Sequence, residues 1–171
     1  MRLLVIGNSG SGKSTLARRT ADAGQLPLLD LDAIVWAPGK IAVQRSMDAV
    51  LADLDRFLDA HDRWVIEGCY GDLAARAAPR CTLMLFLNPG IDACIDNNMR
   101  RPWEPHKYAS QAEQDAMLDT LQRWVRAYGE RDDAWSLRAH RALFDAHPGA
   151  KRELTDSAAI LVGLKPSMPA T

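Results

Sequence analysis

The sequence predicts an α/β domain in which a parallel β-sheet lies between layers of helices. Short apolar runs alternate along the chain with longer amphipathic stretches, which is typical of a parallel sheet with helical crossovers. The first apolar run also leads through a glycine-rich turn directly into a helix-forming stretch. A chain of 171 residues can form one such domain with a full core, and we find no repeat or second-domain boundary, so we expect residues 1–171 to be a single domain.

The expected elements follow from local patterns. Strands are predicted at residues 2–6, 26–31, 63–66, 81–87 and 151–155. Helices are predicted after the glycine-rich turn, in the helix-forming stretch 15–19, and at residues 46–60, 91–101, 110–128 and 134–147. Ser110 and Glu113 form a capping box ahead of the clearest apolar stripe, and Pro148 with Gly149 ends the last helix. We expect helix 46–60 to cover the sheet or to form part of a substrate flap at about 36–62.

Residues 7–14 read GNSGSGKS, which matches the phosphate-binding P-loop pattern G-x-x-x-x-G-K-[ST] at every fixed position. Glycines let the backbone turn tightly with its N–H groups facing inward, and the next helix adds the positive end of its dipole. Lys13 is expected to reach the terminal phosphates of ATP as a catalytic cation, and Ser14 to ligate Mg²⁺. The alternative is a simple Gly/Ser turn, which the order of strand, loop and helix disfavours. The predicted nucleotide-binding residues are Gly7, Asn8, Ser9, Gly10, Ser11, Gly12, Lys13, Ser14 and Thr15.

Two carboxylates stand two residues apart in LLDLDAIVW, at the end of a predicted strand. If the strand continued, Asp30 and Asp32 would point the same way. The carboxyl ends of parallel strands line the ligand crevice, so both acids are expected near the P-loop lysine. We predict that one of the two acids ligates a metal through water, with Asp30 as the candidate. The other would accept a substrate hydroxyl proton, a role for which Asp32 and Glu67 are both candidates. A helix N-cap or a solvated turn is the alternative.

A third signal is WVIEGCY, where a buried strand ends in an acid and a glycine. Glu67 at this place is predicted to hold a metal-bound water or to position a hydroxyl. Gly68 would allow close approach by the substrate. The alternative is that Glu67 pairs with an arginine in the crevice.

Arg100 and Arg101 end a predicted helix and precede the proline-rich PWEPH. Stabilising charge on a transferring phosphoryl group requires cations, so we predict a lid at about 100–110 that brings Arg100 or Arg101 to the phosphates. The alternative is a solvated helix C-terminus that interacts with its dipole.

Composition further narrows the classes of protein to which this chain could belong. No segment approaches the roughly 18 apolar residues of a membrane span. The net charge of −1 disfavours direct nucleic-acid binding. The three cysteines lack C-x-x-C spacing and are expected to be buried thiols. Because the first strand begins at Met1, no room is left for a secretory signal, and a cytoplasmic protein is expected.

The remaining aromatic and histidine residues form no recognisable site. The four histidines have no metal-ligand spacing and are interpreted as surface or capping residues. The five tryptophans are interpreted mostly as core, with Trp36 as a candidate for stacking on a base or ring.

Together, the P-loop, LDLDAIVW and WVIEGCY resemble the small bacterial P-loop proteins called adenylate-kinase-related or DNA-topology-modulation proteins, in the nucleoside-monophosphate-kinase group. The resemblance covers about the first 130 residues and is specific in the first 70. It implies a three-layer P-loop NTPase fold, a five-stranded parallel sheet with the P-loop strand in the middle, ATP and Mg²⁺ binding, and a mobile lid. Adenylate kinases carry Asp-Gly-aromatic-Pro-Arg where this chain has Glu67-Gly68-Cys69-Tyr70, so the arginine that grips the acceptor nucleotide is missing. Shikimate and gluconate kinases are similar in size and also have an acid after the second strand, but the Gly-Gly-Gly turn of shikimate kinases is absent.

The expected function is that of an adenylate-kinase-like phosphotransferase. It would move the γ-phosphate of ATP to a small-molecule acceptor, with a nucleoside monophosphate among the candidates. The alternatives are a regulatory nucleotide-binding protein or slow NTPase linked to DNA topology, and a P-loop protein that only binds nucleotide. The acceptor and the oligomeric state are not predicted.

Overall fold

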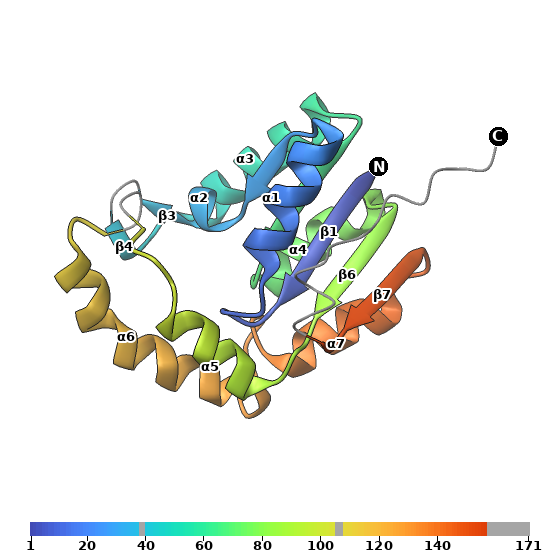
Figure 1. The fold of residues 1–171 in the computed structure, drawn as a ribbon. Coiled ribbons are helices and arrows are strands. Elements are labelled where there is room, and N and C mark those ends of the chain that lie inside the picture. The colour runs from blue at the N-terminus through green and yellow to red at the C-terminus, as the bar shows by residue number, and fades with distance from the viewer. Residues whose placement is uncertain (38–39, 105–107, 157–171) are drawn as a thin grey trace.

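The computed structural model describes residues 1–37, 40–104 and 108–156, with residues 40–42 described by their backbone alone. Five parallel strands form the central sheet in the order β2-β5-β1-β6-β7, so the P-loop strand lies in the middle (Figure 1). The predicted α/β fold with a five-stranded parallel sheet is therefore confirmed. The strands are β1 (Arg2–Gly7), β2 (Leu28–Asp30), β5 (Trp64–Gly68), β6 (Leu83–Leu87) and β7 (Ala150–Leu154).

The central strand β1 is buried on both faces, which explains its uninterrupted apolar sequence. Leu4 and Ile6 face one cluster of core side chains, and Leu3 and Val5 face the other. All four side chains are fully buried. Strands covered on both sides carry apolar residues at every position, because successive side chains point to opposite faces.

Helices cover both faces of the sheet. On one face α1 (Lys13–Gly24) packs through Leu16, Ala17 and Ala21. On the other face the core includes side chains of four helices. These are α2 (Asp32–Val35), α3 (Met47–Ala60), α4 (Gly71–Ala77) and α7 (Leu137–Ala146). Of the two roles expected for residues 46–60, the structure shows the first, because Leu54 and Leu58 of α3 are buried in this core.

Two further helices flank the P-loop. They are α5 (Ile91–Met99) and α6 (Gln111–Arg126), which pack against each other beside the loop (Figure 1). The predicted capping box is present in part: the Ser110 hydroxyl accepts from the Glu113 N–H at 3.1 Å. The Glu113 carboxylate accepts from the Ala109 N–H at 2.7 Å rather than from Ser110 itself. A capped start lets α6 begin sharply at the end of the predicted lid.

Several predicted boundaries were wrong. The strand expected at 26–31 is shorter because the chain turns into α2 directly after it, and the helix expected from 134 begins at Leu137 because Ser136 caps it through Ala139 N–H at 3.2 Å. The predicted flap region also contains an unpredicted antiparallel pair, β3 (Trp36–Ala37) and β4 (Lys40–Gln44). A two-residue strand has no periodicity that sequence patterns could detect.

His140 of α7 corrects the prediction that the histidines lie at the surface. Its side chain is fully buried, between Tyr128 and the backbone of Cys69. Nε2 donates to the Cys69 carbonyl at 2.9 Å, which leaves Nδ1 to accept from the Tyr128 hydroxyl at 2.6 Å. His147 is buried as well. Burial lowers the pKa of His140 to about 4, with the charges of Lys13 and Arg131 acting in the same direction.

We therefore expect the contribution of His140 to the stability of the fold to fall between pH 6.5 and 5. The unfolded histidine takes up a proton near pH 6.5, whereas buried His140 stays neutral down to about pH 4, so acid favours the unfolded state. The expected loss at pH 5 is about 2 kcal/mol. Chemical denaturation of wild type and His140→Gln at pH 7.5 and 5 checks this. The difference in unfolding free energy between wild type and His140→Gln should shrink by about this amount from pH 7.5 to pH 5, whereas the difference for His61→Gln should stay the same.

Candidate functional site

The P-loop runs from the end of β1 to the first turn of α1. Gly7, Gly10 and Gly12 have φ angles of 149°, 79° and 94°, which side-chain-bearing residues rarely adopt. A Cβ at Gly10 would also lie 2.2 Å from the Cys94 carbonyl oxygen, so α5 leaves no space for one. The loop leads into α1 at Lys13, whose first turn presents N–H groups that intrahelical bonds do not use. This is the backbone arrangement expected of a phosphate-binding loop.

The Lys13 ammonium lies over the loop. Its Nζ donates to the Asn8 carbonyl at 2.7 Å, and the residue is only 7% exposed. Asn8 is buried and holds the loop to the end of α6, because its Nδ2 donates to the Val125 carbonyl at 3.1 Å. The lysine is therefore held at the position where the loop would present it to a phosphate group.

Two asparagines of α5 support the loop from outside. Asn97 Nδ2 donates to the Gly10 carbonyl at 2.8 Å. Asn98 is buried, and its Oδ1 accepts from the Ser9 hydroxyl at 3.4 Å and from Arg101 at 2.8 Å. The sequence reasoning missed these residues, since their only signal is a pair of polar side chains inside an otherwise ordinary helix.

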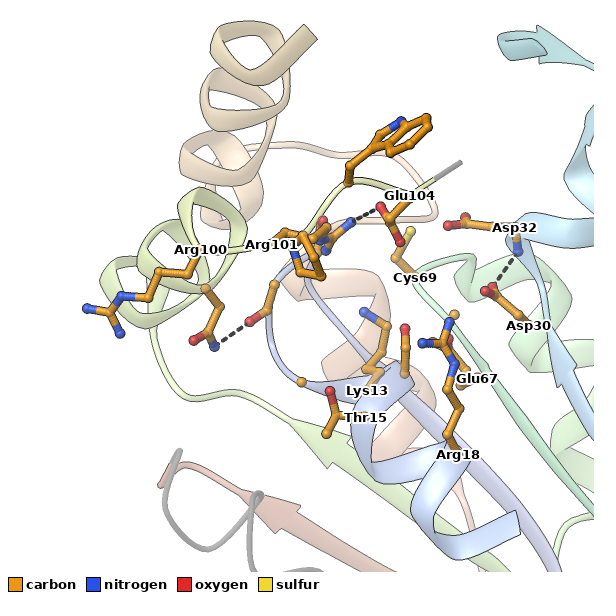
Figure 2. A pocket seen from close by; sticks show the side chains of 18 residues that line it. Lys13, Thr15, Arg18, Asp30, Asp32, Glu67, Cys69, Arg100, Arg101 and Glu104 are labelled. Atoms are coloured by element: carbon orange, nitrogen blue, oxygen red, sulfur yellow. Dashed lines mark hydrogen bonds and ion pairs between the residues drawn. The ribbon is translucent and has the colours of Figure 1, made fainter. Parts of the chain in front are cut away.

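A pocket of about 520 Å³ opens over the P-loop. Figure 2 shows the loop lysine, the acids of the strand ends and the arginines of the lid around it. The loop and α1 contribute Ser9, Gly10, Gly12, Lys13, Ser14, Thr15 and Arg18. The strand ends and the turns after them contribute Asp30, Asp32, Glu67, Gly68 and Cys69. The end of α5 and the lid contribute Asn97, Arg100, Arg101, Pro102, Trp103 and Glu104.

Asp30 and Asp32 line this pocket, but they do not belong to one continuous strand as expected. The strand does not continue: β2 ends at Asp30, and α2 begins at Asp32. Asp30 Oδ1 accepts from the Asp32 N–H at 2.9 Å, a bond that closes the turn between β2 and α2. The N-cap of α2 is Leu31, so neither acid has the capping role of the predicted alternative. Both acids line the pocket.

Glu67 lies inside β5, next to Asp30 of β2 in the register of the two strands. Burial and the negative charge of Asp30 raise its pKa to about 7, and Lys13 and a hydrogen bond from Ser14 act against this rise. The groups that favour the charged form of Glu67 include Lys13 and Ser14. Gly68 lines the pocket and also has a packing reason, because a Cβ there would lie 2.8 Å from the Leu31 side chain.

Asp32 is held by two aromatic side chains that the sequence did not single out together. The Tyr70 hydroxyl donates to Asp32 Oδ1 at 2.5 Å, and Trp36 Nε1 donates to the same hydroxyl at 2.8 Å. Tyr70 is buried, and its ring packs edge-to-face against that of Trp135, with the two ring centroids 5.2 Å apart. Burial and the Asp32 charge raise the pKa of Tyr70 well above its ordinary value, so the phenol remains a donor.

The two lid arginines differ in their surroundings. Arg101 donates to Glu104 at 3.2 Å and to Asn98 at 2.8 Å, and its side chain is 30% exposed. The Arg100 side chain is 78% exposed and lies 3.9 Å from Asp96. In Figure 2 the Arg100 guanidinium points away from Lys13 and the acids, whereas Arg101 lies between Lys13 and Glu104. Of the predicted lid, residues 105–107, which include His106, lie outside the described part.

The donors around Ser14 fit a hard cation. The Ser14 hydroxyl bonds to Glu67, which neighbours Asp30, so one hydroxyl and two carboxylates lie at the same side of the pocket. Mg²⁺ prefers such oxygen ligands and completes its shell with phosphate oxygens and water. Among the described residues no group of three or more His, Cys, Asp or Glu side chains is arranged to hold a metal by itself. Asp30 and Ser14 therefore fit a metal that would arrive with the nucleotide.

Comparison with known proteins supports the fold. No protein-family model matches the sequence, and no curated protein matches it significantly. Among solved structures, a sugar kinase from Janibacter sp. HTCC2649 is 18% identical over 94% of this chain and 90% of its own, with a TM-score of 0.51. A gluconokinase from Sinorhizobium meliloti 1021 is 18% identical over 94% of this chain and 87% of its own, with a TM-score of 0.49. The chain thus has the fold of small P-loop kinases, at low sequence identity.

The finer resemblance to adenylate-kinase-related or DNA-topology-modulation proteins stays a prediction. No helix in the described part of the chain is both long and apolar enough to cross a membrane.

Proposed function

We propose that this protein is an ATP-dependent phosphotransferase that moves the γ-phosphate of ATP to a hydroxyl group of a small-molecule acceptor. The observation that carries the proposal is one pocket in which a P-loop with its lysine faces the acids of two strand ends. A phosphate-binding loop alone serves binding or hydrolysis. Acids on the opposite wall add a place where an acceptor hydroxyl can be held and deprotonated.

The roles follow from the surroundings of each group. Lys13 binds the β- and γ-phosphates, and Arg101 neutralises charge on the phosphoryl group as it transfers. Asp32, held by Tyr70, orients the acceptor hydroxyl and takes its proton. The hydroxyl oxygen forms the new P–O bond while the bond between the γ-phosphorus and the bridging oxygen breaks, so ADP leaves. Buried Glu67, bonded to Ser14, lies on the metal side with Asp30.

Mg²⁺, when bound, would offset the negative charge of the phosphates. Ser14 would hold it directly, and Asp30 or Glu67 through water. The expectation of a nucleotide-binding kinase fold agrees with the structural similarity to the Janibacter sugar kinase. A nucleoside monophosphate, which would accept the phosphoryl group on a phosphate oxygen, stays the alternative to a hydroxyl acceptor.

The test is a screen of hydroxyl and phosphate acceptors with ATP and Mg²⁺, followed by ADP release and by mass detection of the phosphorylated product. A kinase should release ADP far faster with one acceptor class than with water. Slow ADP release that no acceptor accelerates would instead favour the regulatory nucleotide-binding protein or slow NTPase.

Turnover is expected to require Mg²⁺. Excess EDTA should abolish product formation, because the phosphate charges are then left to Lys13 and the lid alone. Ser14→Ala should raise the Mg²⁺ concentration needed for half-maximal rate, whereas Ser46→Ala, which removes the cap of α3, should not. Undiminished product formation in EDTA would contradict the prediction.

A further inference from the structure

Trp103 is the most exposed of the five tryptophans, all of which lie in the described part of the chain. It is 44% exposed and lines the pocket, whereas Trp64 is fully buried and the other three are half-buried. Three of the five tryptophans belong to the core or pack against it, as expected, and Trp103 is an exception. A large apolar ring at the wall of a polar pocket becomes favourable when a ligand covers it.

The backbone on both sides of Trp103 is anchored. One side chain of α6, Gln114, accepts from the Glu104 N–H at 2.9 Å and donates to the Pro102 carbonyl at 3.2 Å. These bonds hold the main chain while the indole itself remains exposed. The ring is thus displayed from a fixed position rather than placed by its own packing.

The wall across from this segment is made of hydrogen-bond acceptors. Figure 2 shows Glu104, the neighbour of Trp103, facing Asp32 and Cys69 across the pocket. A carboxylate with about four lone-pair sites can accept from a ligand hydroxyl in addition to the bond from Tyr70. The lining cations of the described part belong to α1 and to the end of α5 with the lid. An anionic acceptor would therefore bring its charge toward Asp32 and Glu67.

We propose that the phosphoryl acceptor is a neutral ring compound rich in hydroxyls, of the saccharide or cyclitol class, whose C–H face stacks on Trp103 while one hydroxyl bonds to Asp32. Such a ring has an apolar face for the indole and hydroxyl donors at its edge, which matches the two walls. The inference rests on the proposed phosphotransfer and adds the chemical class of its acceptor. It assigns Trp103 the role of selecting that class.

Binding is tested apart from catalysis. Tryptophan fluorescence is titrated with neutral aldoses and cyclitols, with gluconate and with AMP, all in saturating ADP and Mg²⁺ so that no phosphate is transferred. A neutral ring compound should change the emission saturably in wild type and not in Trp103→Phe. Trp124→Phe is the matched control and should keep the change, because its indole is stacked under Arg131 at 3.8 Å and does not line the pocket.

Kinetics give the second measurement. Trp103→Ala should raise the acceptor KM about tenfold with little change in kcat or in the ATP KM, since about 50 Å² of contact is lost at about 25 cal/mol per Å². Trp103→Phe should restore most of the affinity, because a flat ring remains. A merely structural role would lower kcat and stability together.

The outcomes separate the two proposals. If gluconate or AMP is bound and phosphorylated in preference to every neutral ring compound, the acceptor class is wrong and the phosphotransferase stands. If neutral ring compounds bind at Trp103 but no product forms, the acceptor site stands and phosphotransfer fails. If no neutral ring compound changes the emission of Trp103, the inference is overturned.

Discussion

Lys13→Ala is expected to lower kcat/KM for ATP by at least about a hundredfold, since one charged contact to the β- and γ-phosphates is lost. The fold should survive, because the side chain contributes one hydrogen bond to the Asn8 carbonyl and no core packing. Nucleotide affinity by calorimetry and turnover by ADP release, measured beside a thermal melt, check both parts.

Lys151 offers a matched control for this experiment. Its ammonium also binds backbone carbonyls, those of Phe144 at 2.9 Å and Asp145 at 2.7 Å, but it does not line the pocket. Lys151→Ala should therefore leave ATP binding unchanged. Lys13→Met, which keeps most of the buried volume, should match Lys13→Ala in activity. Near-wild-type turnover in both Lys13 variants would remove the basis of the proposed function.

Arg101→Ala is expected to reduce kcat by about a hundredfold or more with little change in ATP affinity, because a transition-state cation acts on the transferring group. Its guanidinium already lies at the pocket, held by Asn98 and Glu104. The exchange of these partners for phosphate oxygens would need only a small movement of the side chain. Turnover with the accepted substrate, and ATP Kd measured separately, check this.

Arg100→Ala is the comparison variant. With a side chain that is 78% exposed and directed away from Lys13, Arg100 should contribute little to kcat. The sequence left Arg100 and Arg101 as equal candidates, and this pair of variants separates them. Equal, strong loss in both would mean that the lid rearranges on closure. Full activity in both would refute a catalytic lid and favour a nucleotide-binding role.

Local patterns were sufficient to predict the P-loop and the central sheet. The P-loop is a continuous motif whose glycines adopt positive φ angles. Residues 7–15 could therefore be predicted from the sequence as a phosphate-binding loop. The sheet was predictable for a similar reason, because a strand buried on both faces must be apolar throughout. Boundaries failed where a cap or a turn decided them, as Ser136 and Asp30 do.

The sequence identified the acids of the pocket, but it did not show which side chains hold them in place. Asp30, Asp32 and Glu67 stand at or near strand ends, and the carboxyl ends of parallel strands meet at one edge of the sheet. The hydrogen bond from Tyr70 to Asp32 joins residues 38 positions apart in the sequence. No spacing rule covers such a contact, since it depends on how the start of α4 lies against the start of α2.

The amino-acid sequence by itself determined the fold class, the phosphate-binding loop and the acids that face it, because short-range periodicity and motif spacing encode them. Only the tertiary structure decided which arginine faces the pocket, that α5 supports the loop through Asn97 and Asn98, and that Trp103 is exposed at the pocket wall. Successive residues of a helix point about 100° apart, so the direction of a side chain at its end depends on how the helix is rotated against its neighbours. That rotation is set by packing between segments far apart in the chain.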